Sequence, residues 1–170
     1  MNSETKVGAV FPQTEIGPDP ADVARYAQTV ESMGFDHLVV YDHILGANSA
    51  SRPGWSGPYD SDDGFHEVFV LYGYIAAVTK RIGLSIGVLV TPLRQTALAA
   101  KQAAAVDVLS HGRLRLGVGV GWNHVEYEAS SETFSDRGVR IEEQIGPRRR
   151  LWSDELVTYS GPFHTPPDAR

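Results

Sequence analysis

The sequence predicts an α/β fold in which strands and helices alternate around a parallel sheet. Four short apolar runs begin near residues 7, 38, 82 and 114, and one helix-like segment separates each run from the next. This order is typical of βαβ units with right-handed crossovers. The 170 residues are 42% hydrophobic and 21% charged, which suits a single globular domain over 1–170.

The first unit is a strand over 7–11 and a helix over about 20–33. Asp19 is a candidate N-cap, because Pro20 follows it at a position where proline is favoured in helices. Apolar residues then recur at helical spacing, and Gly34 is placed to end the helix.

The second unit begins with the nearly continuous apolar and aromatic run 37–41, which predicts a strand covered on both faces. A loop over 42–64, rich in Gly, Pro, Ser and Asp, follows this strand. Loops longer than about 12–15 residues in compact domains are usually functional or disordered, and we favour a functional loop. Residues 66–79 complete the unit as an apolar helix.

The third unit is a strand over 82–90 and an alanine-rich helix over 95–109, with Gly112 as a stop signal. The fourth unit is a strand over 114–121 and a helix over 135–152. Gly146-Pro147 should kink or break that last helix, because an interior proline costs about 3 kcal/mol.

After this helix, residues 156–165 could form a small hairpin around Ser160-Gly161. Four βα units are half of an eight-stranded barrel, which typically needs about 250 residues. A four-unit sheet could also stay open as a small doubly wound fold, or two copies could close together. The residue pattern alone leaves these three architectures open.

Composition and charge exclude several function classes. The 15 basic and 21 acidic residues give a net charge of −6, which disfavours nucleic acid as a partner. Without cysteine there is no disulfide framework, and the six scattered histidines lack metal-ligand spacing, so we expect no metal site. The longest apolar run, 68–78, is much shorter than the roughly 20 residues of a membrane span. With a polar start, these features indicate a cytoplasmic protein without membrane association.

The leading candidate for chemistry is Asp42-His43, directly after the second predicted strand. Barrels and open α/β sheets place their sites at the carboxyl ends of strands, where this imidazole could donate a proton. The competing interpretation is a turn cap beside an ordinary loop histidine. Thr91 and the alternating glycines of 117–121 end the neighbouring strands, although GxGxG alone favours close packing over nucleotide binding.

Several segments together resemble one known family. They are Met33-Gly34-Phe35-Asp36-His37 leading to Tyr41-Asp42-His43, Thr79-Lys80-Arg81-Ile82-Gly83-Leu84, Leu89-Val90-Thr91-Pro92-Leu93-Arg94, Ser110-His111-Gly112-Arg113-Leu114, and Gly117 to Trp122. Arg137-Gly138, Ile141-Glu142-Glu143 and Leu151-Trp152 extend the likeness to the fourth helix. The chain resembles the luciferase-like monooxygenase superfamily, and within it the oxidoreductases that depend on the deazaflavin coenzyme F420.

The resemblance implies a (β/α)8 TIM barrel, of which this chain holds the first four βα units and is truncated before strand five. It implies a cofactor ring over the carboxyl ends of the strands and hydride exchange with an organic substrate. His43 would donate a proton or stabilise the ring, and Val88-Leu89 would hold a non-prolyl cis peptide. The resemblance further implies that the cofactor is contacted by Asp42, Val88, Leu89, Thr91, Val120 and Gly121.

One position departs from part of the family. Some members carry a catalytic glutamate where this chain has Trp122, which argues against sugar-phosphate dehydrogenation. Trp122 and Asn123 are instead candidate substrate contacts.

The first functional hypothesis is hydride transfer between F420 and a small organic substrate. An FMN-dependent monooxygenase is the alternative enzyme, because the same barrel serves both cofactors in this family. A non-enzymatic alternative is an inactive, truncated half-barrel that self-associates, since open strand edges favour a homo-oligomer. A small phosphate-binding doubly wound domain is weaker, because no glycine-rich phosphate loop precedes a helix.

Overall fold

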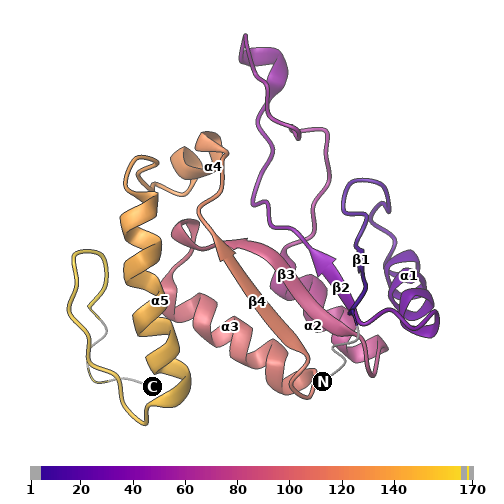
Figure 1. Ribbon diagram of the computed structural model, residues 1–170. Helices are drawn as coiled ribbons and strands as arrows, with labels where there is room; N and C mark the ends of the chain where they lie inside the picture. The colour runs from indigo at the N-terminus through magenta and orange to yellow at the C-terminus, as the bar shows by residue number, and fades with distance from the viewer. Residues whose placement is uncertain (1–4, 166–167, 169–170) are drawn as a thin grey trace.

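A four-stranded parallel sheet forms the centre of the molecule (Figure 1). The computed structural model describes residues 5–165 and 168. The strands lie side by side in chain order, and they are β1 (Gly8–Val10), β2 (His37–Val40), β3 (Gly83–Val90) and β4 (Leu114–Gly119). The four predicted strands and their parallel pairing are therefore confirmed.

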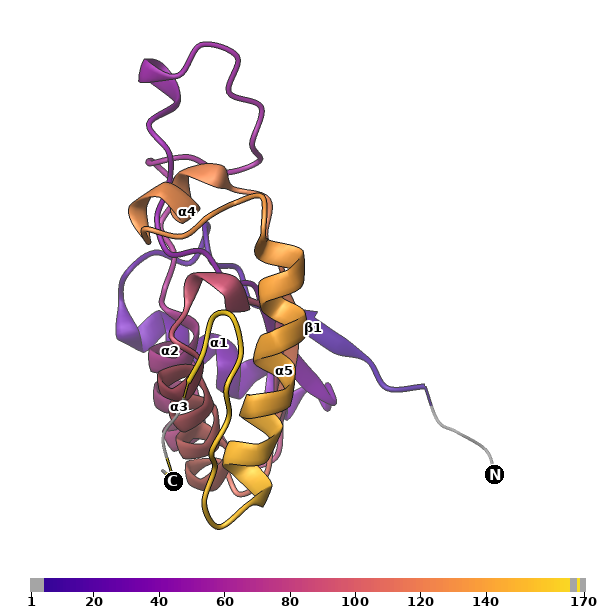
Figure 2. The ribbon, with the colours of Figure 1, turned by 90° about the vertical axis from the view of Figure 1, so that its left-hand side faces the viewer.

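Four helices match the predicted ones, and they are α1 (Pro20–Ser32), α2 (Val68–Val78), α3 (Thr96–Leu109) and α5 (Arg137–Ser153). Asp19 caps α1 as expected, because its side chain accepts a hydrogen bond from the backbone N–H of Ala21. Helix α4 (His124–Ala129) and two single 3-10 turns, Ser49–Ser51 and Thr91–Leu93, were not predicted. Helices α1, α2 and α3 lie along one face of the sheet (Figures 1 and 2).

The hydrophobic core fills the space between the sheet and these helices. Leu38 and Val40 of β2 and Leu84 of β3 are fully buried there against apolar residues of α1, α2 and α3. His37 and Val39, on the other face of β2, are only half-buried. The expectation that both faces of this strand are covered is wrong, because the helices pack on one face only.

Helix α5 runs without interruption through Pro147, so the predicted break is absent. Contacts on both sides of the proline hold the helix in place. Before it, Gln144 Nε2 donates to the backbone oxygen of Arg94 at 3.2 Å, and after it, Trp152 Nε1 donates to that of Ala100 at 2.9 Å. Tertiary packing thus outweighs the local preference of Gly146-Pro147.

The predicted hairpin over 156–165 does not form as a pair of strands among the described residues, although Val157 takes part in an isolated β-bridge. The segment instead makes a turn in which the N–H of Gly161 donates to the carbonyl of His164 at 2.9 Å. Its next donor, the N–H of Phe163, bonds to the carboxylate of Glu143 on α5 at 3.1 Å. Side chains of α5 thus bond to backbone groups of this segment, since Arg150 Nη1 also donates to the carbonyl of Thr158 at 3.1 Å. Within the described part of the chain, no helix is both long and apolar enough to cross a membrane.

Candidate active site

A pocket of about 240 Å³ opens at the carboxyl ends of the strands, between the loop after β2 and the start of α4. Its lining residues are Tyr41, Asp42, His43, Tyr59, Gly87, Val88, Val90, Gly121, Trp122 and Glu126. Five of the nine predicted site residues, Asp42, His43, Val88, Gly121 and Trp122, therefore meet around one cavity. Parallel strands end at the same edge of a sheet, which is why residues so distant in sequence converge here.

His43 is largely enclosed, with its side chain 10% exposed. Its Nδ1 atom lies 3.2 Å from Oε1 of Glu126. The ring packs among three aromatic side chains, those of Phe65, Tyr59 and Trp122, with centroid distances of 4.8, 5.1 and 5.6 Å. When the ring proton is on Nδ1, Nδ1–H donates a hydrogen bond to the carboxylate of Glu126. Nε2 is then the ring nitrogen that remains for a ligand.

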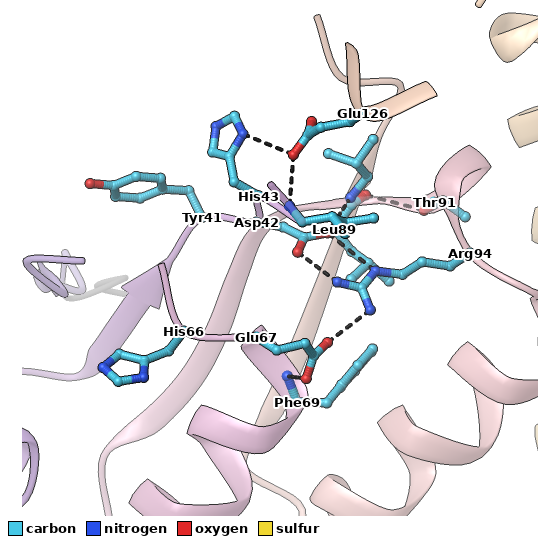
Figure 3. A network of polar contacts seen from close by, with 12 residues as sticks. Tyr41, Asp42, His43, His66, Glu67, Phe69, Leu89, Thr91, Arg94 and Glu126 are labelled. Carbon is cyan, nitrogen blue, oxygen red and sulfur yellow. Dashed lines mark hydrogen bonds and ion pairs between the residues drawn. The ribbon is translucent and has the colours of Figure 1, made fainter. Parts of the chain in front are cut away.

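Glu126 is the functional residue that sequence reasoning missed. It is 1% exposed, and its Oε1 also accepts the backbone N–H of Ile44 at 2.6 Å and that of Leu45 at 3.4 Å. One carboxylate thus holds both the imidazole and the chain that follows it (Figure 3). The available signal was Asn123 followed three residues later by Glu126, a pattern typical of a helix start after a strand.

Asp42 is anchored beneath the pocket by an ion-pair network (Figure 3). Its Oδ2 accepts the backbone N–H of Val90 at 2.9 Å, and its Oδ1 lies 2.7 Å from Nη2 of Arg94. Arg94 also bonds to Glu67 at 2.8 Å, and Glu67 caps α2 through the backbone N–H groups of Phe69 and Val70. Burial lowers the pKa of Arg94, but the two carboxylates outweigh it, so the net pKa is raised and the guanidinium stays charged. The side chain of Asp42 is 0% exposed, and a contact with a cofactor stays a prediction.

Tyr41 lines the pocket with an uncharged aromatic side chain. It stacks on Tyr59 with a centroid distance of 5.7 Å. Burial, followed by the hydrogen bond with Tyr59, raises the pKa of Tyr41 to about 12, so its phenol is protonated at neutral pH. The side walls of the pocket are therefore mostly aromatic and uncharged.

The loop after β2 rises above the sheet (Figure 1), and Tyr59 from this loop lines the pocket. It is pinned across its own width, because Ser49 Oγ donates to Asp60 at 2.7 Å and the N–H of Ser61 bonds to the carbonyl of Ala47 at 2.9 Å. Gly57 passes between two indoles, where an added Cβ would lie 2.6 Å from ring atoms of both Trp55 and Trp122.

The family follows from a comparison with known proteins. The family model for luciferase-like monooxygenases matches residues 4–170. The chain belongs to the luciferase-like monooxygenase family. The resemblance noted in the sequence is thereby confirmed.

The names of similar proteins contain one of two cofactors, F420 or FMN. The chain is 32% identical over 157 residues to an F420-dependent glucose-6-phosphate dehydrogenase of Kribbella flavida, covering 88% of this chain and 43% of the relative. An F420-dependent secondary alcohol dehydrogenase in complex with an F420-acetone adduct has a TM-score of 0.78 at 23% identity, covering 97% and 47%. The FMN-bound oxygenating constituent of 3,6-diketocamphane monooxygenase from Pseudomonas putida has a TM-score of 0.73 at 16% identity, covering 94% and 42%.

The chain spans about half the length of the curated relatives it matches, between 43% and 56% for those compared. The four βα units described above are accordingly a half-barrel of the luciferase-like fold.

One residue pair expected from the luciferase-like family needs correction. The non-prolyl cis peptide joins Gly87 and Val88, one residue before the expected Val88-Leu89. It lies within the stretch where the β3–β4 pairing shifts register, between Ile86 and Leu89. Leu89 itself is fully buried, so its predicted contact with a cofactor has no surface in the pocket.

Three further predicted positions lie outside the pocket lining. Thr91 is 0% exposed, and Arg148 approaches its hydroxyl at 3.4 Å. Asn123 is 2% exposed and caps α4 by accepting the N–H of Val125 at 3.1 Å, so it serves the helix start. The carbonyl of Val120 accepts the hydroxyl of Tyr127. Their assigned contacts with cofactor or substrate remain predictions for the bound state.

The glycines at the end of β4 allow close packing against β3. A Cβ at Gly119 would lie 2.5 Å from a methyl carbon of Val88, and one at Gly121 would lie 2.6 Å from Val90. Gly121 also has a φ of +68°, which disfavours other residues. The packing interpretation of GxGxG is correct for these two positions, and Gly121 in addition borders the pocket.

Proposed function

We propose that this half-barrel carries the catalytic histidine and one face of the cofactor site of an oxidoreductase that transfers a hydride between F420 and a small organic substrate. The observation that carries the proposal is His43, fixed by Glu126 inside an aromatic pocket at the carboxyl ends of the strands. When bound, the deazaflavin supplies a hydride donor or acceptor that does not activate oxygen.

The lining residues fit a flat ring. Two glycines, Gly87 and Gly121, are among the lining residues and add no side-chain bulk to the pocket. Tyr41, Tyr59 and Trp122 add aromatic surface to the same lining. A planar ring system would pack against the glycines, and the aromatic side chains would remain for the substrate.

In this arrangement His43 acts on the substrate through Nε2. Oxidation of an alcohol or reduction of a carbonyl requires a proton to leave or reach the substrate oxygen, and a positioned imidazole performs that transfer. Trp122 contacts the apolar body of the substrate. The network of Asp42 and Arg94 keeps the ends of β2 and β3 in register beneath the ring.

The alternative cofactor is FMN, supported by the structural likeness to the FMN-bound monooxygenase. A fluorescence titration of the purified chain with each cofactor tests the choice. We expect micromolar binding of F420, weaker binding of FMN, and at least tenfold weaker F420 binding in His43→Ala. Gly64→Ala is the matched control, because a Cβ at Gly64 meets nothing within 4 Å. Tighter binding of FMN, together with turnover that requires O₂, would favour the monooxygenase.

We also propose that the chain functions as a homo-oligomer. Strand β1 pairs only with β2, and β4 pairs only with β3 among the described residues, so both outer edges are available for further pairing. Light scattering measures the mass directly. A monomer that binds neither cofactor would leave the inactive half-barrel as the better account of this chain.

A further inference from the structure

A second pocket, of about 210 Å³, lies at the opposite ends of the strands from the candidate active site. It is bordered by the starts of β2, β3 and β4, and its lining residues are Lys6, Asp36, His37, Arg81, Gly83, Gly112, Arg113 and Arg115. We refer to it as the basic pocket. The two pockets share no lining residue.

The basic pocket concentrates positive charge in an acidic protein. Four cationic side chains border it with a single carboxylate, whereas the whole chain has 15 basic and 21 acidic residues. In the described part of the chain, none of these four cations lies within 4.0 Å of a carboxylate oxygen. The single carboxylate, that of Asp36, accepts a hydrogen bond from the backbone N–H of Val7 at 2.7 Å. It is therefore bonded to the backbone and not to one of the four cations. A concave surface lined by one sign of charge raises the local concentration of the opposite ion.

Arg113 is held rigidly at this pocket. Its Nε donates to the carbonyl of Ser110 at 2.7 Å, and its Nη1 donates to the carbonyl of Ile82 at 3.0 Å. Its Nη2 reaches the carbonyls of Ala76 and Thr79 at 3.1 and 3.2 Å. Nη1 also donates to Oγ1 of Thr79 at 3.0 Å, so every N–H of the guanidinium is engaged and Arg113 offers the pocket its charge rather than a free donor. Burial lowers the pKa of Arg113 and outweighs the opposing effect of the Glu31 charge.

Arg81 and Arg115 supply the exposed cations. Arg81 lies just before β3 and is exposed. Its backbone N–H donates to Glu31 at 2.6 Å, and this bond does not use the guanidinium. Arg115 is on β4, opposite Ser85 of β3, and its side chain is exposed. Two exposed guanidinium groups in the same pocket as the fixed charge of Arg113 suit an anion with several oxygen atoms, because guanidinium binds such groups bidentately.

We propose that the basic pocket binds a small multivalent anion of the phosphate class, such as pyrophosphate or a phosphate monoester. The volume of about 210 Å³ accommodates one or two phosphoryl groups, and no Phe, Tyr or Trp lines it to stack a base. Its position at the amino ends of the strands makes this binding independent of the hydride chemistry proposed above.

Calorimetric titration of the 170-residue protein with inorganic pyrophosphate, inorganic phosphate and glucose 6-phosphate, at constant ionic strength, tests the proposal. We expect pyrophosphate to bind more tightly than phosphate, since it carries more charge. Arg115→Gln and Arg81→Gln should each weaken pyrophosphate binding about five- to tenfold, whereas Arg115→Lys should weaken it less than threefold. Comparison of glucose 6-phosphate with phosphate decides whether the ligand is an ester or the free ion.

Arg25→Gln is the control, because Arg25 is an exposed cation paired with Asp22 on α1. It should leave the affinity unchanged. Equal losses in Arg25→Gln and Arg115→Gln would mean general charge attraction and would overturn the proposal, as would the absence of pyrophosphate binding at low salt. His43→Ala should bind pyrophosphate normally, so failure of the F420 titration is separable from failure here.

Discussion

Nδ1 of His43 and Oε1 of Glu126 lie 3.2 Å apart and join two segments 83 residues apart in the sequence. The same oxygen accepts the backbone N–H of Ile44, so the orientation of the imidazole and the course of the loop after β2 depend on one carboxylate. Helix α4 is six residues long, and it holds the group on which the candidate catalytic residue depends.

Glu126→Ala should therefore destabilise the fold and misplace His43. The buried N–H of Ile44 and the imidazole lose their acceptor, which costs about 1–3 kcal/mol of unfolding free energy. Urea unfolding measures this loss, and imidazole ¹⁵N shifts measure the tautomer. We expect the Nδ1–H form in the native protein and a mixture in the variant.

The control for this prediction is Glu31→Gln, which alters another carboxylate that accepts backbone N–H groups, those of Lys80, Arg81 and Ile82. It should lower stability without changing the His43 tautomer. An unchanged tautomer in Glu126→Ala would contradict the positioning role of Glu126.

Arg94→Gln should destabilise the protein more strongly. Asp42 has a fully buried side chain, and without Arg94 its charge loses its only ion-pair partner among the described residues. Breaking a buried pair from one side typically costs about 3–5 kcal/mol. Urea unfolding of Arg94→Gln, Asp42→Asn and the double variant measures the coupling. Additive losses would show that the two side chains act independently.

Gly57→Ala should change the pocket wall without unfolding the domain. The new methyl group meets the rings of Trp55 and Trp122 at 2.6 Å, so the loop must shift away from α4. Tryptophan fluorescence should change, and F420 affinity should fall severalfold. Gly64→Ala in the same loop meets no atom within 4 Å and should behave as the native protein.

The stability should also depend on pH through Glu31. Burial opposes ionisation of its carboxyl, but hydrogen bonds from Arg81, Ile82 and Lys80 outweigh it and hold the pKa below the ordinary 4.5. A carboxyl whose pKa is lowered by folding contributes stability above its unfolded pKa and loses it as the pH falls through the folded value. Urea unfolding of the native protein and Glu31→Gln should therefore differ at pH 7 and converge below pH 4.5. A constant difference down to pH 3 would rule out this linkage.

Local signals were enough to predict the strands, the main helices and the Asp19 cap, because apolar periodicity and capping act within one element. The exact partners of Asp42 and His43 were not predictable in this way. Arg94 reaches Asp42 across 52 residues and Glu126 reaches His43 across 83, and Glu67 joins the network through Arg94, 27 residues away. Only the parallel sheet brings these segments together. The uninterrupted helix through Pro147 has the same origin, since contacts with α3 and with Arg94, after the turn Thr91–Leu93, outweigh a local preference.

The placement of Asp42-His43 at a strand end was predictable from the order of the elements, but its chemical surroundings were not. Trp122 and Asn123 were both predicted to contact substrate. Trp122 lines the pocket, whereas Asn123 is buried and caps α4. Both follow β4, and the sequence does not indicate which of the two side chains borders the pocket.

The sheet order β1-β2-β3-β4 follows the order of synthesis. Each new strand emerging from the ribosome finds its hydrogen-bonding neighbour already present, and no later segment has to insert between two earlier ones. Such a sheet grows at one edge only, and shape and stability accumulate with each added unit. A chain built this way is modular along its length, which makes the βα unit a natural step for duplication and fusion of genes.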